Sequence, residues 1–329
     1  MNEMFFPVQW SLLSASALAQ QILDVYALPT ALSCHFWSRS INDTYRIRAD
    51  ETTFFLRVSP TGWRSYEHLS AEIELLHFLR QHAFPVPEPI RQRGGAYIQT
   101  LNAPEGPRYA VAFSLAPGSS PAPITEVFSY RYGQAIAHLH TLTNTYPKDC
   151  AHHHFDLEGM LDESLARLKP LFIDHQDDFV YLGEISNRLK QNANMLPQTA
   201  PYYGICHGDV HSGNILFDTQ QAWTLIDFEY AGYGWRVIDI SNFILVQVNQ
   251  FGSKGQTRTI RAAFLDGYQS VRRLSEMEVE AIPAFVVLRQ IWMLGITARL
   301  SANLGLEMVQ TWIFDHCMPF IRDWMTEPW

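Results

Sequence analysis

Apolar and polar side chains alternate along several short stretches in the first third of the chain. Tyr45 and Ile47, for example, alternate with Arg46 and Arg48. A period of two is typical of a half-buried β-strand, because successive side chains point to opposite faces of a sheet. We therefore expect four strands here, over residues 42–48, 53–58, 96–100 and 108–115.

The period changes between the second and the third of these strands. Four apolar residues recur there every three or four positions, namely Leu69, Ile73, Leu76 and Leu79. This spacing predicts a single helix over 65–82 with one buried face. The helix is expected to end before the proline-rich segment 85–89, because the residue before a proline disfavours helical geometry.

A segment rich in Pro, Gly and Ser over 116–123 predicts a linker, and the chain beyond it is mostly helical in pattern. Helices are expected over 128–142, 157–171 and 179–193 and from residue 239 onwards. Three short strands interrupt them, over 203–207, 215–217 and 223–226. The predicted fold class is α+β with two lobes: a small antiparallel β-sheet lobe over 1–115 and a larger, mostly helical lobe over 116–329.

Composition and charge narrow the class of protein. The chain has 329 residues, enough for about two domains. Hydrophobic residues make up 47% of it, which excludes a disordered chain. The net charge of −9 argues against a nucleic-acid partner, because an acidic surface repels phosphate backbones.

The sequence also bears on location and assembly. Cys34, Cys150, Cys206 and Cys317 are far apart and form no CxxC pair, which fits a reducing cytoplasm. The N-terminus has no basic region, so no export signal is expected. The apolar stretches are interrupted by polar residues before they reach the ~20 residues of a membrane span. We expect a cytoplasmic protein without a membrane partner; the sequence is compatible with a homodimer but does not determine the oligomeric state.

The strongest chemical signal is His207-Gly-Asp-Val-His-Ser-Gly-Asn214, followed by Leu225-Ile-Asp-Phe-Glu229. Phosphoryl transfer needs one carboxylate to orient the attacking hydroxyl and accept its proton. It also needs hard oxygen ligands that hold Mg²⁺ against the phosphates. Asp209, Asn214 and Asp227 offer this set, and a hairpin between the two motifs would let the two Mg²⁺ ligands converge.

The two motifs resemble the aminoglycoside phosphotransferase, choline kinase and type II homoserine kinase group, which has the protein-kinase-like fold. The resemblance implies that Asp209 is the catalytic base and that Asn214 and Asp227 are Mg²⁺ ligands. It also implies that Asp239 braces the catalytic loop, although a plain helix N-cap is an alternative role for this residue. His207 is expected to be structural.

In the N-terminal lobe, the resemblance places a phosphate-covering loop at 38–44, where Ser40 and Asn42 can present donors to phosphates. The strand residue that is usually lysine in this family is Arg57, an alternative phosphate binder. Glu72 falls within the apolar arc of the predicted helix and needs a cationic partner there, unless it reaches the solvent at the rim. In the resembling kinases that partner is the strand cation, which implies an Arg57–Glu72 pair.

The same resemblance implies that the backbone near Phe113, Ser114 and Leu115 faces an adenine. We therefore expect a kinase that uses ATP and Mg²⁺ to phosphorylate a small-molecule hydroxyl. Two alternatives remain open: a protein Ser/Thr kinase on the same fold, and a nucleotide-binding scaffold without catalysis. The sequence does not identify the acceptor. His211 and the three histidines at 152–154 are expected in solvated loops rather than in a metal site.

Overall fold

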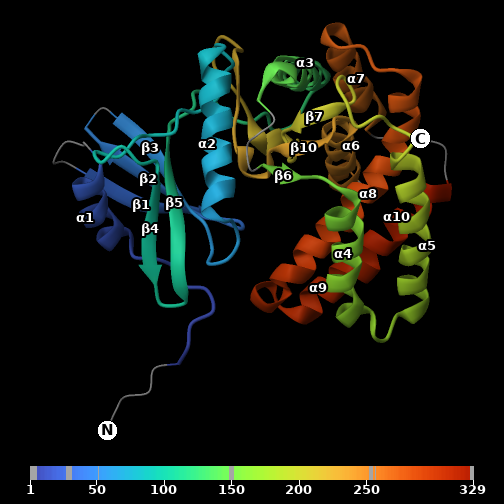
Figure 1. Ribbon diagram of the computed structural model, residues 1–329, viewed down its shortest axis with the longest axis horizontal. Helices are drawn as coiled ribbons and strands as arrows, with labels where there is room; N and C mark the ends of the chain where they lie inside the picture. Colours follow the sequence, from blue (N-terminus) through green and yellow to red (C-terminus); the bar gives the residue numbers. More distant parts are fainter. Residues whose placement is uncertain are drawn as a thin grey trace. The chain divides into compact units, whose positions relative to one another are not determined.

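The computed structural model describes residues 6–26, 32–50, 52–147, 152–251, 255 and 257–326 (Figure 1). The chain forms two compact units. Unit 1 comprises residues 1–119, 148–152 and 216–229, and unit 2 comprises 120–147, 153–215 and 230–329. Unit 1 is therefore discontinuous, since residues 216–229 group with the N-terminal part of the chain.

Unit 1 is built on an antiparallel sheet with the strand order β1-β2-β3-β5-β4. Its strands are β1 (Leu32–Arg39), β2 (Asp43–Ala49), β3 (Thr52–Val58), β4 (Ile98–Ala103) and β5 (Gly106–Ser114). The four strands expected from the alternation are confirmed. The edge strand β1 was not predicted, because the adjacent aromatic residues Phe36 and Trp37 break the period of two. In the structure their side chains are 41% and 57% exposed.

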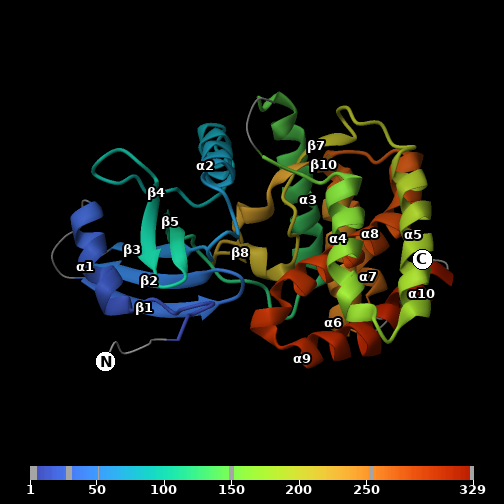
Figure 2. The same ribbon diagram turned by 60° about the horizontal axis from the view of Figure 1, so that its bottom comes forward.

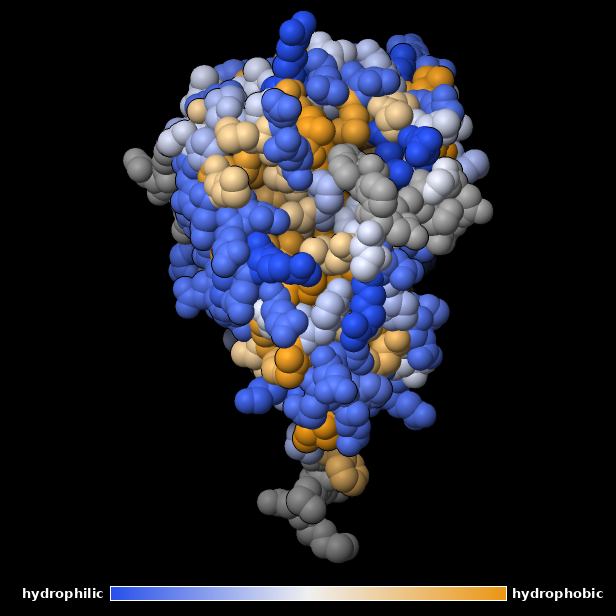
Figure 3. Space-filling view, turned by 90° about the vertical axis from the view of Figure 1, so that its right-hand side faces the viewer, coloured by the Kyte–Doolittle hydropathy of each residue, from blue (hydrophilic) through white to orange (hydrophobic). Residues whose placement is uncertain are grey.

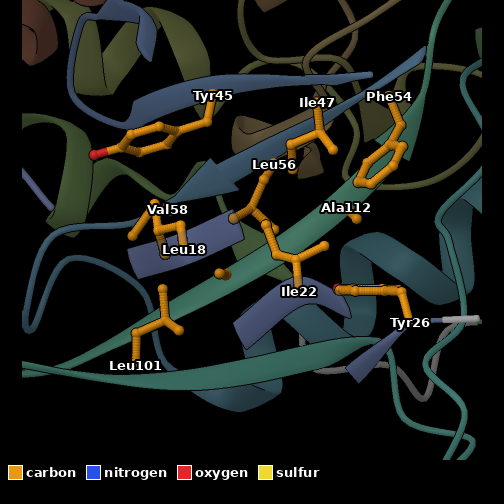
Figure 4. Close-up of a cluster of buried hydrophobic side chains, with 11 residues drawn as sticks. Leu18, Ile22, Tyr26, Tyr45, Ile47, Phe54, Leu56, Val58, Leu101 and Ala112 are labelled. Carbon is orange, nitrogen blue, oxygen red and sulfur yellow. The ribbon is translucent and has the colours of Figure 1, made fainter. Parts of the chain in front are cut away.

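The sheet carries a helix on each face, because neighbouring residues of one strand point in opposite directions. Helix α1 (Ala15–Val25) packs Leu18 and Ile22 onto the face that carries Leu56 (Figure 4). Helix α2 (Tyr66–Gln81) packs onto the other face, where Leu69 and Ile73 meet Val111. The prediction of a single helix in the first third is therefore wrong, since α1 is a second one with a buried apolar side.

Helices dominate unit 2, where α8 (Glu276–Leu304) packs against α4 (Glu163–Leu168), α5 (Gln176–Ala193) and α6 (Val237–Phe251) (Figure 2). Helix α8 is long and apolar enough to cross a membrane. However, 72% of its most apolar window is buried within the structure, which is typical of a core helix. The surface seen in Figure 3 is mostly hydrophilic, interrupted by hydrophobic areas.

The remaining helices complete the predicted helical pattern. They are α3 (Glu126–Leu142), α7 (Arg258–Val271), α9 (Leu306–Trp312) and α10 (Met318–Thr326). The stretch expected as one helix over 157–171 is instead a succession of a π-helical turn, α4 and a 3₁₀ turn. Helix α3 packs along α7.

A small three-stranded sheet in unit 2 has the order β6-β10-β7, from β6 (His153–His154), β10 (Gly232–Trp235) and β7 (Tyr203–Cys206). Strand β10 was not predicted, because its sequence Gly-Tyr-Gly-Trp has no strand pattern. A Cβ at Gly232 would lie 2.2 Å from the His153 carbonyl oxygen, so the close approach of β6 requires glycine. The expectation of a solvated loop at 152–154 is wrong, since His152 is buried and the other two form β6.

Strands β8 (Ile215–Phe217) and β9 (Trp223–Leu225) form a two-stranded hairpin between the two motifs, as expected from the sequence. Both of these strands were expected at nearly the same residues. Of the four cysteines, Cys34, Cys206 and Cys317 are free thiols in the described part of the chain, and Cys150 lies outside it.

Candidate active site

The first motif forms a tight loop directly after β7. Gly208 has a φ of +81°, and a Cβ there would lie 2.5 Å from the Tyr230 carbonyl oxygen and 2.6 Å from a Phe155 ring carbon. Both the backbone conformation and the lack of space therefore require glycine at this position. The turn at Gly208 leads the backbone from the buried His207 to the partly exposed Asp209.

Asp239 holds the backbone of this loop. Its carboxylate accepts hydrogen bonds from His207 N at 2.7 Å and from Gly208 N at 2.8 Å. It also accepts one from His140 Nε2 at 2.9 Å. The predicted bracing contacts are thus present. The N-cap alternative is wrong, because Asp239 lies within the first turn of α6 rather than before it.

The His140–Asp239 pair is fully buried. Burial lowers the pKa of His140 to about 4, although Asp239 favours the charged form. The imidazole is therefore neutral at pH 7, donates from Nε2 to Asp239 and accepts at Nδ1 from the Tyr268 hydroxyl at 2.7 Å. Burial by itself would raise the pKa of Asp239, but the hydrogen bond from His140 and the loop N–H groups lower it.

Among the described residues, His140, Cys206 and Asp239 also form the one cluster of three or more His, Cys, Asp or Glu side chains whose ligand atoms lie close together, all within 4.8 Å. These atoms do not suit a metal. Both nitrogens of His140 are used in hydrogen bonds. Burial raises the pKa of Cys206 well above its usual value, so its thiol stays protonated and a poor ligand.

Asp209 is held on both carboxylate oxygens. Oδ1 accepts from Arg289 Nη2 at 3.3 Å, and Oδ2 accepts from Asn214 Nδ2 at 3.1 Å and from His211 Nε2 at 3.2 Å. Burial acts to raise the pKa of Asp209, but the His211 hydrogen bond and the Arg289 charge lower it to about 2. Its side chain is 24% exposed, so an ionised carboxylate is within reach of a ligand.

Asn214 is oriented by its contacts to Asp209. Its Nδ2 donates to the Asp209 backbone oxygen at 2.9 Å as well as to Oδ2. Because the amide nitrogen must face these two acceptors, the amide Oδ1 points away from them and is the atom that suits a hard cation. His211 was expected to be solvated. Its side chain is 35% exposed, and it also accepts from Gly213 N at Nδ1, which leaves Nε2–H to donate to Asp209.

In unit 1, the implied Arg57–Glu72 pair is present. Nη1 and Nη2 of Arg57 lie 3.0 and 2.5 Å from the two carboxylate oxygens of Glu72. The two side chains are only 11% and 5% exposed, so the alternative that Glu72 reaches solvent is excluded. Burial acts to lower the pKa of Arg57, but Glu72 outweighs it and raises the pKa above its usual value.

Asp227 follows β9 in the same unit and lies beside this pair. Its Oδ1 is 3.4 Å from Arg57 Nη1, and its side chain is 45% exposed. Its φ of +63° is an uncommon conformation for a residue other than glycine.

Asn42, predicted to contact phosphate, is turned toward Glu229. Its Nδ2 donates to Glu229 Oε2 at 2.5 Å, and Trp63 Nε1 donates to Oε1 at 2.7 Å. Arg64 Nε lies 3.5 Å from the same Oε1. Trp63 and Arg64 were not found from the sequence, because no motif connects them to Glu229. Ser40 remains exposed in the loop.

The predicted adenine-facing residues lie at the end of β5. The Ser114 N–H donates to the Glu88 carbonyl at 2.8 Å, and its hydroxyl accepts from Glu88 N at 2.8 Å. The Phe113 ring lies 5.0 Å from the Arg57 guanidinium carbon. Leu115 follows the strand and is 52% exposed.

Arg289 on α8 is a site residue that the sequence did not indicate. It is 1% exposed, yet it contacts Asp209 and also donates from Nη2 to the Gly208 carbonyl at 2.9 Å. Burial lowers its pKa, but an arginine stays charged at neutral pH. The available signal was an arginine inside the apolar stretch 284–297, a position that a core helix rarely gives to a charge without a partner.

The predicted site residues therefore form two groups. Unit 2 brings together Asp209, Asn214, His207 and Asp239. Unit 1 brings together Arg57, Glu72, Asp227 and Phe113. That the two groups act on one nucleotide stays a prediction.

Comparison with known proteins agrees with the resemblance of the two motifs to phosphotransferases. Residues 35–278 match the family described as "Phosphotransferase enzyme family". The chain is 33% identical to an uncharacterized protein of Synechocystis sp. over 288 residues, which are 87% of this chain and 79% of that protein.

Two solved structures resemble the chain at 21% sequence identity, which shows a shared fold. An amicoumacin kinase in complex with AMP-PNP, Ca²⁺ and amicoumacin has a TM-score of 0.78, with 94% of this chain and 93% of that one covered. A microcompartment-associated aminopropanol kinase has a TM-score of 0.81, with 94% and 98% covered.

Proposed function

The chain belongs to the phosphotransferase enzyme family, and we propose that it transfers the γ-phosphoryl group of ATP to a hydroxyl of a small molecule, with Mg²⁺ as the metal. The observation that carries this proposal is the state of Asp209. Its carboxylate is ionised, partly exposed and held by three side chains, beside an asparagine whose amide oxygen suits a cation.

Asp209 orients the acceptor hydroxyl in this proposal. A pKa of about 2 makes the carboxylate a weak base. A weak base is sufficient, because phosphoryl transfer passes through a loose transition state in which positioning matters more than early proton removal. The carboxylate accepts a hydrogen bond from the hydroxyl and then its proton, as the new P–O bond forms, the bond from the γ-phosphorus to the β–γ bridging oxygen breaks and ADP leaves.

Asn214 and Asp227 are the residues that would hold Mg²⁺, through an amide oxygen and a carboxylate. When bound, the ion neutralises charge on the phosphates. Both residues fit this role, since the Asn214 amide is oriented by Asp209 and Asp227 is 45% exposed. The Ca²⁺ and AMP-PNP in the amicoumacin kinase structure support a divalent ion and an adenine nucleotide in this fold.

Arg57 is proposed to contact the phosphates in place of the more usual lysine. Glu72 fixes its guanidinium in a bidentate contact, so the group is already oriented before a nucleotide arrives. Ser40 and the backbone of the loop around Asn42 would cover the phosphates. Because Ser114 N–H is already used by Glu88, the adenine contact is proposed to fall on Leu115.

The acceptor is proposed to be a metabolic amino alcohol or a sugar-like compound, acted on in the cytoplasm. The names of the two structural neighbours, an amicoumacin kinase and an aminopropanol kinase, support this proposal.

An ADP-release screen tests the proposal. Purified protein is incubated with ATP and Mg²⁺ and with amino alcohols, sugars, aminoglycosides or casein. Acceptor-dependent ADP release with a small molecule, lost in Asp209→Asn while nucleotide binding persists, supports it. Phosphorylation of casein alone points to a protein kinase, and nucleotide binding without transfer to any acceptor points to a scaffold. Retained turnover in Asp209→Asn refutes the role of Asp209.

A further inference from the structure

A buried arginine on α8 reaches the catalytic loop from a distant part of the sequence. The Arg289 guanidinium donates from Nε to Asn242 Oδ1 at 2.9 Å and from Nη2 to the Gly208 carbonyl at 2.9 Å. Its carbon lies 4.1 Å from the centre of the Trp292 ring. Three neighbours therefore fix the plane of the guanidinium, which leaves it no freedom to turn away from the loop.

The fourth neighbour of this guanidinium is the Asp209 carboxylate. Nη2 lies 3.3 Å from Oδ1, whereas Oδ2 already accepts from Asn214 and His211. A carboxylate has about four lone-pair positions, two on each oxygen. Two donors on Oδ2 and one on Oδ1 leave a single lone pair without a donor. This lone pair is on Oδ1, the oxygen that Arg289 contacts.

We propose that Arg289 is a positioning residue for phosphoryl transfer, which sets the rotation of the Asp209 carboxylate so that the remaining lone pair of Oδ1 faces the acceptor hydroxyl. This inference rests on the proposed function. Arg289 does not itself touch the substrate, since it is 1% exposed. It acts through Asp209 Oδ1 and through the Gly208 carbonyl, which anchors the backbone one residue earlier.

Substitutions that keep the size of the side chain separate this role from a structural one. Arg289→Met removes the charge and all three hydrogen bonds, and Arg289→Lys keeps a charge that can reach one of the two loop oxygens. Arg261→Lys on α7 is the matched control, because Arg261 is also a largely buried arginine of unit 2, 7% exposed. The measurements are kcat and KM from ADP release, affinity for AMP-PNP with Mg²⁺, and Tm.

In Arg289→Met we expect kcat to fall by about 100-fold, the usual effect of misplacing a reacting group by about 1 Å. The KM for ATP and the affinity for AMP-PNP should change little. Arg289→Lys should recover part of kcat, and Arg261→Lys should keep wild-type kcat even where its Tm falls. If Arg289→Met unfolds, the comparison of Arg289→Lys with Arg261→Lys carries the test.

Three outcomes would overturn the inference: wild-type kcat in Arg289→Met, equal losses in the Met and Lys variants, or a loss of nucleotide affinity in proportion to Tm. A crystal structure of Arg289→Lys tests the positioning of the Asp209 carboxylate independently of turnover. If the wild type releases no ADP with any acceptor, the proposed function fails. A rotated Asp209 carboxylate in that crystal would then still support the positioning contact, and an unmoved one would refute it.

Discussion

Breaking the ion pair between Arg57 and Glu72 should destabilise unit 1 more than replacing both residues together. The two side chains are 11% and 5% exposed and meet through two contacts. Removing one member of a buried pair leaves an uncompensated charge and costs about 3–5 kcal/mol. Replacing both members with apolar residues of similar size often costs little or nothing.

The structure refines this magnitude. In Glu72→Gln, Arg57 keeps Asp227 at 3.4 Å, but that carboxylate is 45% exposed. A contact of this kind offsets only about 0.2–1 kcal/mol, so a mid-range cost of about 4 kcal/mol would still leave a loss of about 3 kcal/mol. For a folding unit the size of unit 1, a loss of about 3 kcal/mol corresponds to a fall in Tm of about 6–12 °C. Arg57→Met should cost at least as much, since no cation then faces Glu72.

Differential scanning calorimetry of Glu72→Gln, Arg57→Met and the double variant Arg57→Met/Glu72→Leu checks these values. The double variant should unfold near the wild-type temperature and yet gain no stability from ATP with Mg²⁺. Glu88→Gln is the control, because the Arg80–Glu88 pair is 40% and 56% exposed and its loss should change Tm little. A double variant destabilised by the sum of the two single changes would refute this reasoning.

Three further predictions concern unit 2 and the metal. Gly208→Ala should destabilise the loop by about 1–3 kcal/mol and reduce ADP release, because its Cβ would lie 2.5 Å from the Tyr230 carbonyl oxygen; Gly183→Ala, with nothing within 4 Å, is the control. His140 has a pKa of about 4 when folded, so the unfolded chain binds one more proton between about pH 4 and 6.5. The free energy of unfolding should therefore fall by up to about 3 kcal/mol as the pH drops through this range, and His140→Gln should flatten the slope in Tm measured from pH 7 to 5. Asp227→Asn should raise the Mg²⁺ concentration needed for half-maximal ADP release, and an unchanged requirement would exclude it as a metal ligand.

Local patterns in the sequence carried much of the fold and part of the site. The period of α2 was sufficient to place Glu72 on the buried face, because side chains three and four residues apart share one side of a helix. The resemblance of the two motifs to a known family, rather than their spacing, implied that Asp239 braces this loop, and its hydrogen bonds to His207 N and Gly208 N are present.

Contacts between distant segments could not be predicted in this way. Arg289 and Asp209 are 80 positions apart, and no periodicity connects them. Strand β10 consists of four buried residues with two glycines, and it exists because it pairs with β6 and β7 rather than by propensity. Similarly, helix α1 is short, and it is its packing of Leu18 and Ile22 against the sheet that explains its apolar side.

The supports of the catalytic loop come from later in the chain than the loop itself. Asp239 follows Gly208 by 31 positions and Arg289 follows it by 81. A polypeptide growing on the ribosome therefore releases the loop well before the residues that hold it. Under the proposed function, the Asp209 carboxylate is held on both oxygens only after α8 has been made as far as Arg289.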